Sequence, residues 1–111
     1  MNRYVMTGLL ADAREGKDVI LVSATWNAAR AAFDQATDAV LGEAVEVRRT
    51  HGRELVRYRD SGGSLRFVSA GGSSVRGFSA DVVFVDCDAG QAVMAQVVPV
   101  VHSRNGELLR R

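Results

Sequence analysis

The hydrophobic positions of this chain follow two different periods, and the first of them is helical. Over residues 3–14 the apolar side chains recur every three or four positions, so this segment is predicted to form an amphipathic helix that Gly16 ends. Residues 19–23 then form a short apolar, β-branched run, which is typical of a buried strand. A helix followed by a buried strand is the first indication of an α/β fold.

A second helix is predicted after this strand. Thr25 is a suitable N-cap residue, and the apolar stripe that follows it runs to about Leu41, with Gly42 as the stop. Trp26 falls on the apolar face of this helix, so we interpret it as a core anchor rather than a platform for stacking a base.

From residue 45 the hydrophobic period changes to two, which indicates strands. The alternating segments 45–49 and 54–59 are separated by a short polar stretch in which Gly52 supplies a turn, so they are predicted to form a hairpin. Residues 64–70 alternate in part and predict a third strand. The middle of the chain is therefore expected to be an Arg-rich β-meander.

Charge is segregated along the chain although the formal net charge is only +1. Residues 45–76 carry seven arginines against three carboxylates, an excess of +4, which is the pattern expected of nucleic-acid contact. The alternative is a solvated sheet face, because Arg57 and Arg59 alternate with Val56 and Tyr58 and because a GC-rich genome also enriches arginine. The candidate nucleic-acid-binding residues are Arg48, Arg49, Arg53, Arg57 and Arg59.

An uninterrupted apolar run, Val82 to Val85, ends abruptly in Asp86, Cys87 and Asp88. Such a run predicts a strand buried on both faces of a sheet, and acidic residues at its end lie where open α/β sheets bind ligands. Asp86 and Asp88 are therefore candidate ligands for a weak Mg²⁺ site, the one cofactor that we consider. The remaining potential ligands lack the spacing of a metal site: His51, Cys87 and His102.

The end of the chain and its composition complete the prediction. Residues 89–98 are expected to form a helix that Pro99 ends, and residues 107–111 begin one more extended segment. With 111 residues the chain is long enough for a single domain, 1–111, with one core. No run approaches the ~20 apolar residues of a membrane span. One cysteine and no apolar leader favour a cytoplasmic location.

Taken together, these segments resemble the ATPase domain of phage terminase large subunits, the motors that package DNA into capsids. Residues 19–30 look like that family's strand and following helix start, and residues 64–70 are similar to the strand before its acidic motif. The most specific match is residues 75–86, which look like the Arg-Gly segment and the Walker B strand. Residues 98–108 resemble the turn before the coupling-motif strand. The resemblance implies a RecA-like P-loop NTPase core, an α/β fold with a partly parallel sheet and helices packed on it.

Two departures from the family affect the expected activity. The sequence has no Gly-x-x-x-x-Gly-Lys-Ser/Thr phosphate loop, because Gly16-Lys17 is followed by Asp18. Cys87 stands where the family has the glutamate that orients the attacking water, and a thiol does not readily replace that carboxylate. The resemblance therefore implies a truncated domain that lacks the phosphate loop, holds no cofactor firmly and hydrolyses no ATP by itself.

The expected partners follow from the missing phosphate-loop strand. Its loss would leave Val82, Val83, Phe84 and Val85 at a sheet edge, and such edges are usually covered. We expect self-association there, as a homodimer or other homo-oligomer, unless residues 99–111 cover the edge instead. The chain is thus predicted to be a non-catalytic module that binds itself, a phage or host protein, or DNA, with no membrane partner. The alternative is one part of a split motor, in which Asp86 serves a partner chain that carries the phosphate loop.

Overall fold

The computed structural model describes residues 2–50, 53–70, 80–86 and 106–110. Over these residues the chain forms two helices and six strands. They are α1 (Arg3–Arg14), β1 (Asp18–Ser23), α2 (Trp26–Ala39), β2 (Val45–Arg48), β3 (Leu55–Tyr58), β4 (Ser64–Ser69), β5 (Val82–Asp86) and β6 (Glu107–Arg110). Neither described helix is long and apolar enough to cross a membrane.

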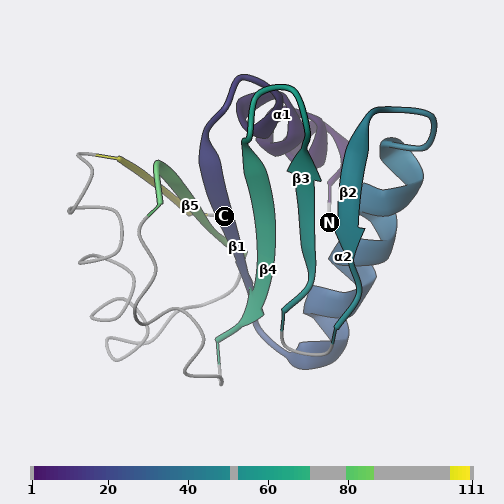
Figure 1. The fold of residues 1–111 in the computed structure, drawn as a ribbon. Coiled ribbons are helices and arrows are strands. Elements are labelled where there is room, and N and C mark those ends of the chain that lie inside the picture. Colours follow the sequence, from purple (N-terminus) through teal and green to yellow (C-terminus); the bar gives the residue numbers. More distant parts are fainter. Residues whose placement is uncertain (1, 51–52, 71–79, 87–105, 111) are drawn as a thin grey trace.

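All six described strands belong to one sheet, in the order β2-β3-β4-β1-β5-β6 (Figure 1). Strand β1 lies between β4 and β5 and is parallel to both, and β5 is also parallel to β6. The hairpin strands β2 and β3 are antiparallel to each other, and β3 is antiparallel to β4. The prediction of a partly parallel α/β sheet with a β-meander is confirmed.

The helices begin where their capping residues predict. The backbone N–H of Tyr4 donates to the Asn2 side chain at 2.7 Å, and the N–H of Ala28 donates to the Thr25 hydroxyl at 3.1 Å. The first helix ends as predicted, with Gly16 at a positive φ of 101° that favours glycine.

The second helix differs from the prediction at its C-terminal end and in the residue that anchors it in the core. It stops at Ala39 rather than near Leu41, which is 79 % exposed just before the turn at Gly42. Trp26 is only partly buried, because it occupies the first turn and the buried stripe of the helix begins at Ala29. The core anchor of this helix is instead Phe33, whose ring packs edge-to-face on Phe67 with centroids 5.4 Å apart.

Both helices pack on one face of the sheet and form the larger core with it. The opposite face of the parallel strands is also buried, at residues that alternate with the first set. Strands β1 and β5 are therefore covered on both faces, as their uninterrupted apolar runs predict. The buried residues of this second cluster are Ile20, Val22, Val68, Ala80, Val83 and Val85.

The prediction that β5 lies at a sheet edge is wrong. Strand β6 pairs with it in parallel, with Val83 opposite Leu108 and Phe84 opposite Leu109. The stated alternative, that the end of the chain covers this edge, is confirmed for residues 107–110. The four proposed interface residues are each 9 % exposed or less, so they lose the reason for which they were assigned to an interface: Val82, Val83, Phe84 and Val85. Gly52 and the predicted helix 89–98 lie outside the described residues.

Candidate functional site

The antiparallel half of the sheet brings three arginines onto one face. Leu55 of β3 lies opposite Arg48 of β2 on one side and opposite Arg66 of β4 on the other. Residues that lie opposite each other share a face, as do alternate residues along a strand, so Arg57 projects on this face too. The residues that alternate with these along each strand, such as Val56, point to the other face and pack against α1 and α2. We call Arg48, Arg57 and Arg66 the arginine face.

The guanidinium groups of this face repel one another. The pKa of Arg66 is lowered from its usual value, first by burial and then by the positive charges of Arg57 and Arg48. Asp18 partly offsets this effect, and the positive charge of Arg53 adds to it. Like charges held together in a half-buried position favour the arrival of an anion.

The arginine face contains a donor that the described protein does not use. The Nε atom of Arg57 is buried and has no hydrogen-bond partner among the described residues. The nearby carboxylates are engaged elsewhere. Glu46 forms an ion pair with Arg48 at 3.7 Å, and Asp18 accepts a hydrogen bond from the Ser64 hydroxyl at 3.0 Å. A buried N–H without an acceptor is costly, so this position suits an external oxygen atom.

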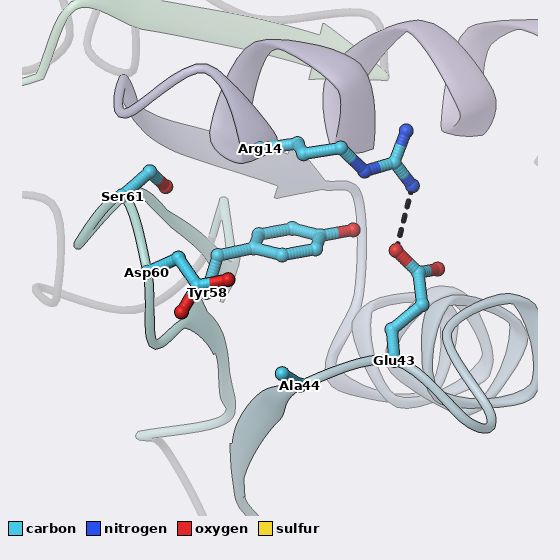
Figure 2. Close-up of a pocket in the computed structure, with 6 residues that line it drawn as sticks. All are labelled: Arg14, Glu43, Ala44, Tyr58, Asp60 and Ser61. Atoms are coloured by element: carbon cyan, nitrogen blue, oxygen red, sulfur yellow. Dashed lines mark hydrogen bonds and ion pairs between the residues drawn. The ribbon is translucent and has the colours of Figure 1, made fainter.

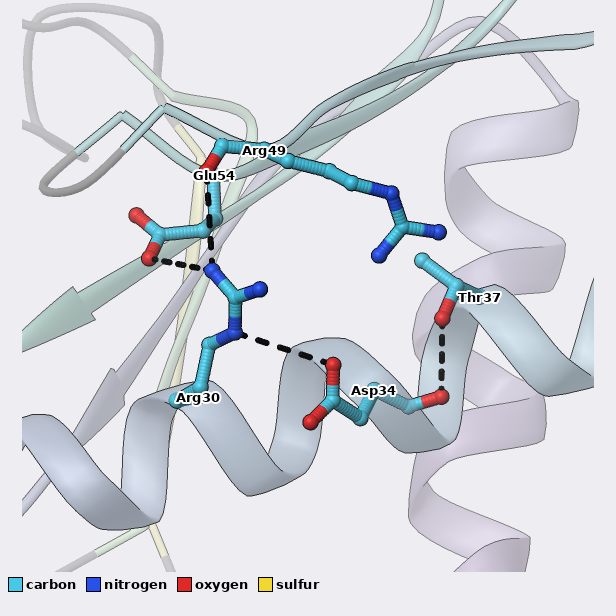
Figure 3. Close-up of polar contacts among 5 residues, drawn as sticks. All are labelled: Arg30, Asp34, Thr37, Arg49 and Glu54. Carbon is cyan, nitrogen blue, oxygen red and sulfur yellow. Dashed lines mark hydrogen bonds and ion pairs between the residues drawn. The ribbon is translucent and has the colours of Figure 1, made fainter.

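The five arginines predicted to bind nucleic acid do not all lie together. Arg48 and Arg57 belong to the arginine face, and Arg59 is exposed just after the end of β3. Figure 3 shows that Arg49 is turned toward α2. Its guanidinium carbon lies 5.5 Å from the centroid of the Phe33 ring. The sequence prediction missed Arg66, although its place between the core residues Leu65 and Phe67 in an alternating strand put it on the face that points away from the helices.

A separate polar cluster ties α2 to the start of β3 (Figure 3). Arg30 of α2 lies 3.6 Å from the carboxylate of Glu54 and 3.7 Å from that of Asp34, and it donates to the backbone carbonyl of Arg49 at 3.5 Å. The Glu54 side chain is 1 % exposed, and neither of its carboxylate oxygens has a hydrogen-bond partner among the described residues. This cluster lies on the helix-covered side, so we interpret it as structural.

A second candidate site lies at the carboxyl ends of the parallel strands. Ser69, Ser23 and Asp86 stand side by side across β4, β1 and β5. After β1 the chain runs through α2 to β2 at one edge of the sheet, and after β5 it runs to β6 at the opposite edge. Open α/β sheets bind ligands at such a switch point, where Thr25 also begins a helix.

The magnesium site predicted there stays a prediction. Asp86 is partly exposed at the end of β5, whereas Asp88 and Cys87 lie outside the described residues. Among the residues that the structure describes, no group of three or more acidic, histidine or cysteine side chains could hold a metal ion.

A small pocket of about 210 Å³ lies on the helix-covered side (Figure 2). Arg14 forms an ion pair with Glu43 at 2.8 Å, and its guanidinium carbon lies 5.5 Å from the centroid of the Tyr58 ring. Burial, followed by the charge of Glu43, raises the pKa of Tyr58, and Arg14 opposes this shift. Arg14 and Glu43 therefore satisfy each other. Its lining residues are Arg14, Glu43, Ala44, Tyr58, Asp60 and Ser61.

Comparisons with known proteins agree with this architecture. No protein-family model and no curated protein matches the sequence. The large terminase of bacteriophage HK97 superposes with a TM-score of 0.79 at 15% identity, over 96% of this chain and 25% of that chain. The large terminase ATPase domain of Thermus phage P74-26 superposes with a TM-score of 0.64 at 21% identity, over 96% of this chain and 50% of that domain.

A large terminase from another thermophilic bacteriophage matches with a TM-score of 0.64 at 15% identity, over 96% of this chain and 28% of its own. The chain thus spans about a quarter of the whole large terminases and about half of the separate ATPase domain. At this level of sequence identity, a structural match establishes the fold and not the activity. The chain therefore has the fold of part of the ATPase domain of phage large terminases.

Proposed function

We propose that this chain is a terminase-fold module that binds nucleic acid through its arginine face and does not hydrolyse ATP by itself. The observation that carries the proposal is the gathering of Arg48, Arg57 and Arg66 on one sheet face, where their charges repel one another. Such a cluster is unfavourable in the free protein and favourable beside a polyanion, so binding relieves the repulsion.

The chemistry of the face favours phosphate over an acidic protein surface. Arginine presents a planar set of donors that matches the oxygens of a phosphate group, and the chain uses arginine almost exclusively, with one lysine in 14 basic residues. The shared fold favours DNA in particular, because the resemblance to terminases implies DNA packaging. The absence of a phosphate-loop motif in the sequence, and Cys87 after Asp86, support a role without ATP turnover.

Duplex DNA binding measured by fluorescence anisotropy over a range of salt concentrations tests the proposal. Three phosphate contacts predict that the logarithm of the affinity falls with the logarithm of salt at a slope of about −3. Arg57→Gln should weaken binding roughly tenfold and reduce the slope by about 1. Arg49→Gln is the matched control, because it removes the same charge from the helix-covered side. An equal loss in both variants, or no binding at low salt, would count against the proposal.

The second candidate function is one part of a split DNA-packaging ATPase. The position of Asp86 beside Ser23 at the switch point of the sheet favours it, because a carboxylate there can help to hold Mg²⁺ for a nucleotide. This chain would then turn over ATP only when a partner chain with a phosphate loop is added, and Asp86→Ala would abolish that activity. In a plain binding module, ATP would change neither DNA affinity nor mass.

Self-association is a further element of the proposal. Strand β6 covers β5, so among the described strands the outer ones are β2 and β6, and a second copy would have to pair there. Light scattering at micromolar concentration measures the mass directly. A mass of one chain across the concentration range would refute self-association without affecting the DNA-binding proposal.

A further inference from the structure

We infer that the arginine face holds a single phosphate group at a fixed position, between Arg57 and Arg66, rather than attracting nucleic acid by diffuse charge alone. This inference rests on the proposed function and makes it more specific. A fixed grip differs from diffuse attraction in one testable respect, because it requires the shape of the guanidinium group and not only its charge.

The strand register brings the side chains within reach of one group. Leu55 lies opposite both Arg48 and Arg66, and Arg57 stands two residues further along the same strand. Arg57 is therefore the diagonal neighbour of Arg48 on one side and of Arg66 on the other. Diagonal neighbours on one sheet face are about 7–8 Å apart at the backbone, a distance that two long side chains span around a common ligand.

The Nε–H of Arg57 supplies the second observation. It is buried and has no acceptor among the described residues, whereas buried polar atoms normally have a partner. Glu46, which lies directly opposite Arg57, forms an ion pair with Arg48 instead. An oxygen of a bound phosphate would satisfy this donor and at the same time reduce the repulsion that Arg66 experiences from its neighbours.

Phosphate fits the site better than a carboxylate does. Among the described residues, the three arginines of the face and Arg53 outnumber the carboxylates near them, which are Glu46, Asp18 and, beside Asp18, Asp81. A tetrahedral group with several oxygens can accept from the fork of one guanidinium and from a second donor on the neighbouring strand. The phosphate can belong to a nucleic-acid backbone or be free in solution, and the experiment separates these two sources.

The test uses lysine substitutions, which keep the charge and remove the planar fork. Binding of inorganic phosphate is measured by titration calorimetry against sodium chloride of equal ionic strength, with thermal unfolding as the check on folding. Arg57→Lys and Arg66→Lys should each weaken phosphate binding about tenfold, the effect of losing one hydrogen bond to a charged group. Arg3→Lys, at an exposed position of α1 on the opposite side of the sheet, should leave phosphate binding unchanged.

A second arm measures duplex DNA binding with phosphate or with chloride of equal ionic strength as the competitor. Competition by phosphate beyond that of chloride, lost in Arg57→Lys and Arg66→Lys, supports the inference. Normal DNA binding in those variants, with no specific competition, overturns the inference and leaves the proposed function intact. Phosphate binding without DNA binding supports the site and refutes the proposed function. Absence of phosphate binding together with absence of DNA binding refutes the inference and the proposed function.

Discussion

The buried carboxylate of Glu54 offers a test of how the helix-covered side of the sheet is held together. Its only described ion pair is with Arg30, at 3.6 Å, and both of its oxygens lack hydrogen bonds in the described region. We expect Glu54→Met to stabilise the protein, because methionine has a similar length and fills the same space without a charge.

The magnitude follows from two opposing contributions. At an effective dielectric constant of about 20, two unit charges 3.6 Å apart attract by about 4–5 kcal/mol. Burying one carboxylate costs several kcal/mol, and each buried oxygen without a hydrogen bond adds about 1–3 kcal/mol. Arg30 is 39% exposed, so water weakens the attraction further. The cost exceeds the gain, and Glu54→Met should raise the free energy of unfolding by about 1–3 kcal/mol.

Urea unfolding, followed by circular dichroism at neutral pH, measures this difference. A double-mutant cycle with Arg30→Met separates the pair from the burial of the carboxylate. Arg30→Met alone should cost about 3–5 kcal/mol, because it leaves a buried charge without its partner. In the Glu54→Met background the same change should cost less than about 1 kcal/mol. If Glu54→Met itself destabilises the protein with an unchanged m-value, the ion pair outweighs the burial cost and the reasoning is wrong.

Three further predictions concern local geometry and pH. A Cβ on Gly63 would clash with the backbone oxygen of Ala13, so Gly63→Ala should destabilise the protein by more than about 3 kcal/mol in the same urea assay. Gly8→Ala in the helix, where nothing lies within 4 Å of the new Cβ, should instead stabilise it by about 1 kcal/mol. The raised pKa of Tyr58 means that the folded state holds this proton more tightly than the unfolded state. The stability that this proton contributes is complete below about pH 10 and is lost at higher pH. Above pH 10 the urea midpoint should therefore fall less in Tyr58→Phe than in the wild type.

Local elements of the fold were predictable from the sequence because they depend on neighbouring residues. The bounds of the first helix, Arg3–Arg14, follow from its apolar period and from Gly16. The position of β5 at an edge was wrongly predicted, because strand order depends on pairing between segments far apart in the sequence. Trp26 was wrongly predicted to anchor the core. It follows the apolar period of the helix, but it lies in the first turn, before the buried stripe begins at Ala29.

The candidate site was only partly predictable. The arginine-rich segment was visible as a charge excess, yet the grouping of Arg48, Arg57 and Arg66 depends on the register of three strands. A shift of one residue in either pairing would have put one of these arginines against the helices. Arg49 demonstrates the point, because it is adjacent to Arg48 in sequence and lies over Phe33 on the other side of the sheet.

The two proposed functions place their key residues at separate positions in the sheet, and this separation gives a last prediction. Arg57 on β3 and Asp86 on β5 are three strand spacings apart across the sheet, and the register offsets them by about five residues along the strands, so roughly 20 Å separates them. Changes this far apart usually add in free energy. In a binding module, Arg57→Lys should weaken DNA binding equally in the wild-type and Asp86→Ala backgrounds, with or without ATP. If the loss of DNA affinity in Arg57→Lys instead depends on Asp86 and on magnesium-ATP, then nucleotide binding and DNA binding are coupled, which is the property of a motor and not of a passive module.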